Sequence, residues 1–433
     1  MGERGVKASI VVPVYNSSAT LRECFDSLIS QTFEDFEVLV VDDGSSDGSW
    51  EIVREYCAAD GRFKGVRQQN AGPGTARNRA LDRAKGDYVL CVDGDDWIDA
   101  RLLEKAVCKA ESSGADVVVW DAWFHNERTG ARCLSSRVRV DVCEPDGYAW
   151  RDNPDLLFLS FQNWPWNKLI RRALLEEHGI RFQEDVMRTE DCLYTARALV
   201  KANFIVGIPE ALSHYRMAQP DSAMAKTDET PFDCFRAFEA LKSWLEAEGV
   251  YESLSRSHAR WAFSGIVHNL KTVRALDTFK RVHQFMKDEG FERLGLGRKE
   301  APMLLSEESL REYESFVASS PEEYLLSSFS REWRVREDEG VLAGQRWYEI
   351  EQLKREAGLR VRELEISLAD EQRALQDACS ELDELHARFG ELEAAYHALE
   401  NCMEQKIGKA LCRIPRAVQR SCLRRRQRNG RAG

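Results

Sequence analysis

A short apolar run that ends in a cluster of carboxylates constrains the fold of this chain more than any other feature. Tyr88–Val92 is typical of a strand that is buried on both faces of a sheet. Asp93, Asp95 and Asp96 follow almost at once, at the strand end where open α/β sheets bind ligands. Neighbouring carboxylates repel one another unless a cation or hydrogen bonds compensate them. The pattern predicts a divalent metal site, with a polar acidic turn as the alternative.

Further apolar runs alternate with segments of helical periodicity before and after this strand. Strands are predicted at 8–15, 36–41, 64–68 and 117–123, and a further one at 204–208. The alternation indicates an α/β domain with a mostly parallel sheet and helices on both faces. The segment 164–170 is predicted to be a helix. Glu190 and Asp191 precede apolar residues at helical spacing, which places them in the first turn of another helix.

The C-terminal part of the chain has a different character. We expect four regions: an α/β domain at 1–225, a helical appendage at 226–340, a coiled coil at 345–405 and a basic amphipathic tail at 406–433. Apolar residues from Ile350 to Met403 alternate at spacings of three and four, with one extra step of four. This region is predicted to form a homo-oligomer or to bind a helical partner. The tail suits an anionic membrane surface, and the alternatives are a solvated basic tail or an incidental RNA contact.

Charge and composition narrow the classes of partner. The net charge of -12 and the pI near 5.4 argue against a general nucleic-acid binder. The 12 cysteines show no metal-ligand spacing, which fits reduced thiols in the cytoplasm. No apolar run approaches the ~20 residues that span a bilayer. The expected location is cytoplasmic, with peripheral binding at the inner face of the membrane through the tail.

Six short motifs occur in order over residues 7–220, and together they resemble family 2 glycosyltransferases with the GT-A fold. The resemblance implies a Rossmann-like, nucleotide-diphospho-sugar transferase domain of the α/β class. The motifs are Val-Pro-Val-Tyr-Asn at 12–16, Val-Asp-Asp-Gly-Ser-Ser-Asp-Gly-Ser at 41–49, Asn-Ala-Gly-Pro-Gly-Thr-Ala-Arg-Asn at 70–78, Asp-Gly-Asp-Asp-Trp-Ile-Asp at 93–99, Trp-Asn-Lys-Leu at 166–169 and Thr-Glu-Asp at 189–191.

The same resemblance implies roles for individual residues. One aspartate of the pair at 42–43 contacts the nucleobase, with Asp43 favoured over Asp42, and Asp191 is the catalytic base, with Glu190 as the weaker candidate. A divalent cation, Mn²⁺ or Mg²⁺, neutralises the diphosphate leaving group. The remaining donor-binding and metal-binding positions are Pro13, Tyr15, Asn16, Arg77, Asp93 and Gly94 for the donor, and Asp93, Asp95 and His214 for the metal, with Asp96 as the alternative to His214.

The expected activity is non-processive transfer with inversion. The Gln-x-x-Arg-Trp signature of processive synthases does not follow the Thr-Glu-Asp motif, and a single base without a covalent nucleophile implies one displacement. The resemblance implies a nucleotide-sugar donor, most simply a UDP-sugar, and a hydroxyl acceptor on a cell-surface glycan or a lipid-linked molecule. The alternative is a catalytically degenerate scaffold of the same fold that assembles through its coiled coil.

Overall fold

The structure, a computed structural model, describes residues 5–135, 138–143, 147–217, 227–328 and a few positions between 387 and 394. Residues 1–322 form one compact unit and residues 323–433 form a second. Apart from those few positions, the predicted coiled coil at 345–405 lies outside the described residues, and so does the basic tail at 406–433.

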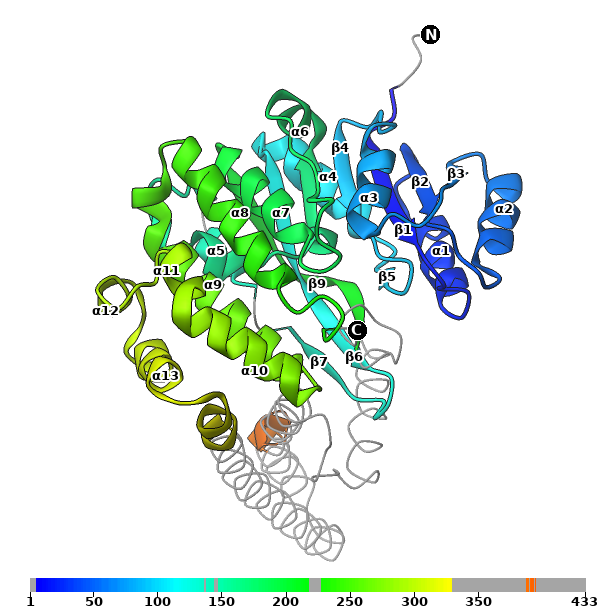
Figure 1. Cartoon of the computed structure of the whole chain (residues 1–433). Coiled ribbons are helices and arrows are strands. Elements are labelled where there is room, and N and C mark those ends of the chain that lie inside the picture. Colours follow the sequence, from blue (N-terminus) through cyan, green and yellow to red (C-terminus); the bar gives the residue numbers. More distant parts are fainter. Residues whose placement is uncertain are drawn as a thin grey trace, which may run out of the picture. The chain divides into compact units, whose positions relative to one another are not determined.

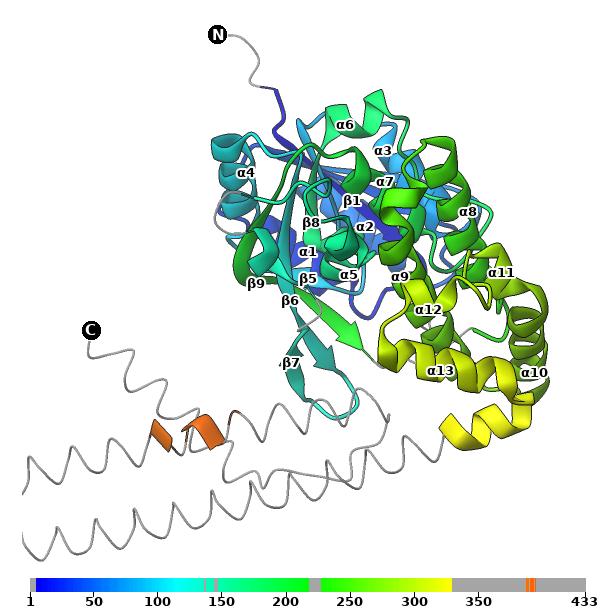
Figure 2. The ribbon, with the colours of Figure 1, turned by 90° about the vertical axis from the view of Figure 1, so that its left-hand side faces the viewer.

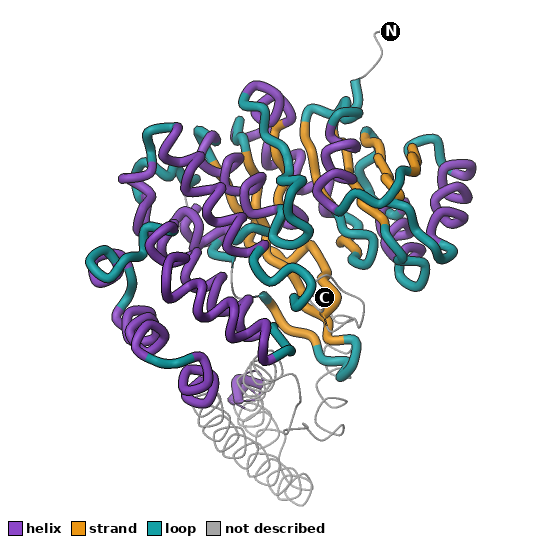
Figure 3. Tube along the Cα trace, in the orientation of Figure 1, coloured by secondary structure: helices purple, strands orange, loops and turns teal. Residues whose placement is uncertain are grey.

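A mixed nine-stranded sheet organises the described part of the first unit (Figures 1 and 3). From one edge to the other, its order is β3 (Phe63–Arg67), β2 (Phe36–Asp42), β1 (Ala8–Val14), β4 (Tyr88–Cys91), β8 (Lys168–Arg171), β6 (Val117–Asn126), β9 (Ile205–Met217) and β5 (Trp97–Ile98), with β7 (Arg132–Leu134) paired to β6. The strands β3, β2, β1 and β4 are mutually parallel. β8 is antiparallel to both of its neighbours.

Two of the expectations that the structure corrects concern β8. The sheet is mixed rather than mostly parallel, and the segment 164–170 is not a helix. It forms a short 3-10 turn at Pro165–Asn167 followed by β8. Leu169 and Ile170 are buried and pair with β4 on one side and β6 on the other. These tertiary contacts override the local helical pattern.

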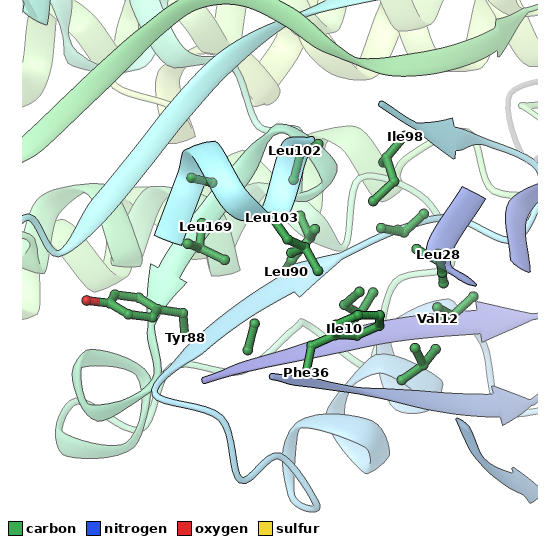
Figure 4. Close-up of a cluster of buried hydrophobic side chains, with 14 of the residues drawn as sticks. Ile10, Val12, Leu28, Phe36, Tyr88, Leu90, Ile98, Leu102, Leu103 and Leu169 are labelled. Carbon is green, nitrogen blue, oxygen red and sulfur yellow. The ribbon is translucent and has the colours of Figure 1, made fainter. Parts of the chain in front are cut away.

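The main hydrophobic core lies between the sheet and the helices that follow its first strands. One face of the sheet packs against α1 (Leu21–Ile29), α2 (Ser49–Ala59) and α4 (Leu102–Ser113), and Figure 4 shows Ile10, Leu90 and Leu103 meeting in this cluster. Val11 and Val41 alternate with the residues of that cluster and are buried as well. α3 (Pro73–Leu81) contacts β1 and β2. Burial on both faces explains the continuous apolar runs of these strands.

β9 is considerably longer than the predicted strand at 204–208. It continues to Met217 and pairs in parallel with β6 along most of its length, with a register shift near Asp121. Its far end pairs with the two-residue β5, where Trp97 faces His214. The long β6 and β9 are visible as neighbouring arrows in Figure 2. β9 therefore brings its last residues beside the acidic turn that follows β4.

Helices complete the first unit, and those after β9 follow the predicted helical periodicity. α8 packs against α7 and α9, and Phe158 of α5 stacks on Trp261 of α9 at 5.1 Å. The remaining elements are α5 (Leu157–Phe161), α6 (Arg172–Glu177), α7 (Asp191–Lys201), α8 (Asp233–Ala247), α9 (Tyr251–Thr272), α10 (Leu276–Phe285), α11 (Phe291–Arg293), α12 (Ala301–Leu304) and α13 (Glu307–Ala318), with a π-helical turn at Met286–Gly290 and further 3-10 turns at Val140–Cys143 and Pro154–Leu156.

Candidate functional site

The polar residues that follow β1, β2 and β4 lie along one edge of the sheet. The backbone amide of Asp43 donates to the carbonyl of Val14 at 2.8 Å, and that of Val92 donates to the carbonyl of Val11 at 2.9 Å. Because the three strands are parallel and adjacent, their carboxyl ends share this edge. This is the edge at which open α/β sheets bind ligands.

The residues predicted to bind the nucleotide lie at the end of β1. Pro13 is within the strand and Tyr15 is exposed just after it. Asn16 has a φ of 50°, a left-handed conformation that asparagine tolerates better than most residues. Its side-chain oxygen accepts from the amide of Ser46 at 2.8 Å, and its own amide donates to the hydroxyl of Ser45 at 3.0 Å. Asn16 therefore ties the loop after β1 to the loop after β2.

Asp43 holds the glycine-rich turn that begins α3. Its Oδ1 accepts from the side-chain amide of Gln68 at 2.8 Å and from the backbone amide of Ala71 at 2.9 Å. Its Oδ2 accepts from the amide of Gly72 at 2.9 Å. A carboxylate oxygen can accept two bonds, so Oδ2 retains capacity for one more donor.

Asp42 is fully buried and only partly satisfied. Its Oδ1 accepts from the backbone amide of Ser45 at 3.2 Å and lies 3.1 Å from Nε of Arg67. Its Oδ2 has no hydrogen-bond partner among the described residues. A buried acceptor without a partner costs free energy. Each aspartate thus has an oxygen with unused capacity to accept a hydrogen bond, although that of Asp42 is buried.

The start of α3 packs closely against the loop that precedes α7. Gly72 has a φ of 92°, which favours glycine, and a Cβ there would lie 2.9 Å from the sulfur of Met187. A Cβ on Gly74 would lie 2.5 Å from the carbonyl oxygen of Gln183. The glycines of this turn therefore permit the approach of the segment that carries the Thr-Glu-Asp motif.

Arg77 joins two of the acidic motifs. Its Nη2 donates to Oδ1 of Asp93 at 2.6 Å and its Nη1 donates to Oε1 of Glu190 at 2.5 Å. The guanidinium is buried and lies over the ring of Phe182. The turn after β4 and the start of α7 are thus held together by one cation.

Gly94, Asp95 and Asp96 form the rest of the acidic turn, and Arg216 of β9 supports it. A Cβ on Gly94 would lie 3.3 Å from the carbonyl oxygen of Pro13, which shows how closely this turn approaches β1. The amide of Arg216 donates to Oδ1 of Asp96 at 2.8 Å, and its Nε donates to the carbonyl of Asp95 at 2.6 Å. Burial and the Asp93 charge raise the pKa of Asp95 to about 6.

The arrangement fits a divalent cation held by Asp93 and Asp95. Carboxylate oxygens are the hard ligands that Mg²⁺ and Mn²⁺ prefer. Beside them, Oδ2 of Asp96 is buried and has no hydrogen-bond partner among the described residues, and burial with the two neighbouring carboxylates raises the pKa of Asp96. Within the described ranges, however, no group of three or more His, Cys, Asp or Glu side chains is placed to share one ion. A cation here would take its other ligands from phosphate and water.

Glu190 and Asp191 occupy different environments although they are adjacent. Glu190 is paired with Arg77. Asp191 begins α7 and its Oδ1 accepts from the side-chain amide of Asn163 at 2.7 Å. Burial and the Glu190 charge raise the pKa of Asp191 to about 7, whereas the Asn163 hydrogen bond acts in the opposite direction. The pKa of Asp191 therefore lies above that of an ordinary aspartate.

His214 has partners other than the acidic turn. Its Nδ1 lies 3.0 Å from Nε2 of His125, and its ring stacks on Trp97 at 5.0 Å. Burial lowers the pKa of His214. Among the described residues, His214 is not grouped with Asp93 and Asp95 as a metal ligand.

Several residues of the site were not identified from the sequence. Asn163 donates to Asp191, and Lys168 is buried at the start of β8. Asp233 of α8 accepts from the backbone amides of Met187 and Arg188 at 2.8 and 3.2 Å. Lys168 lies within the Trp-Asn-Lys-Leu motif, so a buried lysine in an apolar segment was a usable signal. Asn163 and Asp233 lie outside the motifs, and their sequence neighbours carry no comparable signal.

The N-terminal part of the chain is similar to known proteins. The profile of the family described as "Glycosyl transferase family 2" matches residues 9–179. The putative glycosyltransferase EpsH of Bacillus subtilis is 31% identical over 211 residues, which covers 48% of this chain and 60% of EpsH. The poly(ribitol-phosphate) beta-N-acetylglucosaminyltransferase TarS of Staphylococcus aureus is 29% identical over 249 residues, covering 56% of this chain and 42% of TarS. The chain thus spans less than two thirds of either relative.

Among solved structures, TarS 1-349 of S. aureus in complex with UDP-GlcNAc is 23% identical, with a TM-score of 0.46 over 72% of this chain and 91% of that one.

Within the described ranges, no helix combines the length and apolar character needed to cross a bilayer.

Proposed function

We propose that the chain, whose residues 9–179 match the profile of glycosyl transferase family 2, is a non-processive, inverting, metal-dependent glycosyltransferase. It moves a sugar from a nucleotide-diphosphate donor, most simply a UDP-sugar, to a hydroxyl of a cell-surface glycan or lipid-linked acceptor. The single observation that carries the proposal is the convergence of the acidic turn and the Thr-Glu-Asp motif on Arg77. That convergence supports a catalytic base close to a cation-binding turn.

The donor side of the proposed site is the edge formed by the ends of β1 and β2. Pro13, Tyr15 and Asn16 border the nucleoside, and an oxygen of Asp43 or Asp42 accepts a hydrogen bond from the base. Asp43 remains the favoured residue because its Oδ2 is held in place by Gly72 and has room for a second bond. When bound, a cation on Asp93 and Asp95 would neutralise charge on the departing diphosphate.

Asp191 is the proposed base because Glu190 is already committed to Arg77. In the reaction, the acceptor oxygen forms a bond to the anomeric carbon while the bond from that carbon to the diphosphate oxygen breaks. The nucleoside diphosphate leaves with the electron pair, and the acceptor proton passes to Asp191. A base with a pKa of about 7 can take up this proton at neutral pH. One displacement inverts the configuration.

The acceptor class is supported by the relatives. Two relatives, TarS of S. aureus and a beta-glucosyltransferase of Bacillus spizizenii, are by name enzymes that transfer a sugar to poly(ribitol-phosphate). We therefore propose a polymeric or lipid-linked acceptor of the cell envelope, reached from the cytoplasm. The predicted coiled coil would assemble a homo-oligomer, and the basic tail would bind an anionic membrane surface. Light scattering on truncated and full chains, and sedimentation with anionic vesicles, test these two expectations.

A donor screen tests the central proposal. The melting temperature of the full chain is measured with UDP-, GDP- and dTDP-sugars, each with and without Mn²⁺, because a ligand that binds the native state raises it. The expected result is a cation-dependent rise with one nucleotide class, followed by sugar transfer to an acceptor. A chain that binds no nucleotide would favour the scaffold alternative.

A further inference from the structure

A tight turn before β8 is fixed from within by a buried ammonium group. Lys168 is 1% exposed, and its Nζ donates to the carbonyl oxygens of Phe161 and Trp164 at 2.6 and 2.7 Å. Its third donor reaches Oδ1 of Asn167 at 2.7 Å. An ammonium has three donors, so each of them has an acceptor. Lys168 thus holds both ends of the turn 161–164.

The middle of this turn touches the proposed base. Asn163 donates from its side-chain amide to Oδ1 of Asp191 at 2.7 Å, and its carbonyl accepts from the hydroxyl of Thr195 at 2.8 Å. The second contact fixes the backbone of Asn163 against the second turn of α7. The amide is therefore aimed at Asp191 from two fixed supports, the Lys168 ammonium and α7.

Backbone strain occurs on both sides of the contact. Gln162, next to Asn163, has a φ of 53°, and Thr189, two residues before Asp191, has a φ of 64°. Non-glycine residues adopt such angles at a cost, and they retain them where surrounding contacts over-determine the geometry. Gln162 and Thr189 therefore lie on either side of the hydrogen bond between Asn163 and Asp191.

The contact leaves one oxygen of Asp191 available. Oδ1 is bonded to Asn163, whereas Oδ2 has no hydrogen bond to any residue in the described part of the chain. A carboxylate with one oxygen anchored presents the other in a defined direction. A donated hydrogen bond also favours the ionised form, which is the form that can accept a proton.

We propose that Asn163 is a positioning residue for Asp191 and that Lys168 fixes Asn163 by holding the turn 161–164. The inference rests on the proposed function, because it assigns these residues to the base of that reaction. Asn163 anchors Oδ1 so that Oδ2 faces the acceptor hydroxyl. Lys168 neither touches the substrate nor donates to Asp191; it acts through the turn.

Other charged and titratable groups also surround Asp191, so the test compares variants in the same surroundings. The groups that interact electrostatically with Asp191 come from its own helix and from the neighbouring elements. They are Glu190 and Cys192 beside it in sequence, Arg77 on α3, Cys91 and Asp93 at the end of β4, Lys168 on β8, Tyr215 on β9 and Cys234 on α8.

The test is the pH dependence of kcat for the full chain with its donor, cation and acceptor. Asn163→Ala removes the hydrogen bond to Asp191, so the acidic limb of the curve of kcat against pH should move up by about one pH unit. The value of kcat at pH 6 should fall about tenfold. Asn163→Asp keeps the shape but places a second carboxylate against Asp191, so its limb should move further. The KM for the donor should change less than twofold in both variants.

Asn203→Ala is the matched control. Asn203 also donates from its side-chain amide to an aspartate, Asp116, at 3.3 Å, but Asp116 directly precedes β6 and is not part of the proposed site. Its limb should match that of the native chain. Lys168→Met should lower kcat as Asn163→Ala does while leaving the donor KM unchanged. If Lys168→Met does not fold, the Asn163 variants still test the positioning of Asp191.

The outcomes distinguish a failure of the positioning role from a failure of the proposed function. Native turnover with an unmoved limb in Asn163→Ala would overturn the inference and leave the proposed function standing. A limb that moves less in Asn163→Asp than in Asn163→Ala would also overturn it, because a purely structural role requires only the shape. A native chain that binds donor and never transfers sugar would overturn the proposed function and this inference together.

Discussion

Arg77 and Glu190 are separated by 113 positions in the chain, and the Nη1 atom of Arg77 donates to Oε1 of Glu190 at 2.5 Å. The same guanidinium holds Asp93 through its other amino group. The pair is buried, so each charge depends on its partner for the stabilisation that water would otherwise supply. Arg77 therefore joins the two acidic motifs and separates the roles of Glu190 and Asp191.

Removing Arg77 should destabilise the fold. Arg77→Gln leaves Glu190 buried without its cation, and urea unfolding should show a loss of about 3 kcal/mol. The double variant Arg77→Met with Glu190→Met should lose less than the two single variants combined. Arg22→Gln is the control, because Arg22 pairs with Glu55 through two hydrogen bonds on the exposed surface, and this variant should lose much less stability than Arg77→Gln. Equal losses for both arginines would contradict the assignment.

Asp95→Asn should separate cation binding from stability. The variant removes one of two proposed ligands, so the Mn²⁺-dependent rise in melting temperature should vanish. The metal-free variant should melt at a higher temperature than the native chain, since it has one fewer charge beside Asp93 and Asp96. Asp99→Asn, an exposed acid of the same segment, should leave both measurements unchanged. A full Mn²⁺ response in Asp95→Asn would exclude Asp95 as a ligand.

Asp191→Asn should bind donor and fail to transfer it. The amide keeps the shape of the carboxylate but cannot accept the acceptor proton, so kcat should fall at least about a hundredfold. Titration calorimetry should give a donor affinity within about threefold of the native value. In the native chain, kcat should rise with pH through about 7, because Asp191 must be ionised. Full activity in this variant would refute the choice of base.

Asp233 should support the loop that precedes the base. Its carboxylate accepts from the amides of Met187 and Arg188, so Asp233→Ala should loosen that loop and lower kcat about tenfold. Asp233→Asn retains an acceptor oxygen and should recover most of the rate. Limited proteolysis at 183–190 provides a readout independent of activity. Equal behaviour of the two variants would argue against a role for the hydrogen bonds.

The pH dependence of stability should report on His258. This residue is fully buried, its Nε2 lies 3.1 Å from the carbonyl of Phe238, and burial lowers its pKa to about 4. The unfolded chain binds the extra proton first, between about pH 6.5 and 4, so the free energy of unfolding falls as the pH drops through this range. The contribution of His258 is about 2 to 3 kcal/mol. In urea unfolding at several pH values, His258→Gln should therefore show a slope smaller by about one proton than the native chain.

Features with a local signal could be predicted from the sequence. The strands at 8–15, 36–41 and 88–92 were predicted because each is a continuous apolar run bounded by polar residues. Asp191 was placed in the first turn of its helix from the spacing of the apolar residues that follow. The resemblance supplied the choice of residues at the strand ends.

Features that depend on distant partners could not be predicted. Lys168 begins a strand because its ammonium finds three acceptors and because β4 and β6 pair with the residues that follow. The support of Asp96 comes from the backbone of Arg216, 120 positions away. Neither pairing leaves a mark on the residues next to it, so the helix at 164–170 was wrong and the full length of β9 was missed.

The contact between Asp96 and Arg216 joins residues that are synthesised 120 positions apart. When residue 179 has left the ribosome, β1, β2, β4 and β8 are all available to pair. The turn at 93–98 still lacks Arg216, and β5 still lacks the partner strand that Ser213 and His214 provide. A nascent chain can therefore form its proposed nucleotide edge well before its proposed cation edge. Premature loading with donor would bring a nucleotide into a site that cannot yet position the diphosphate.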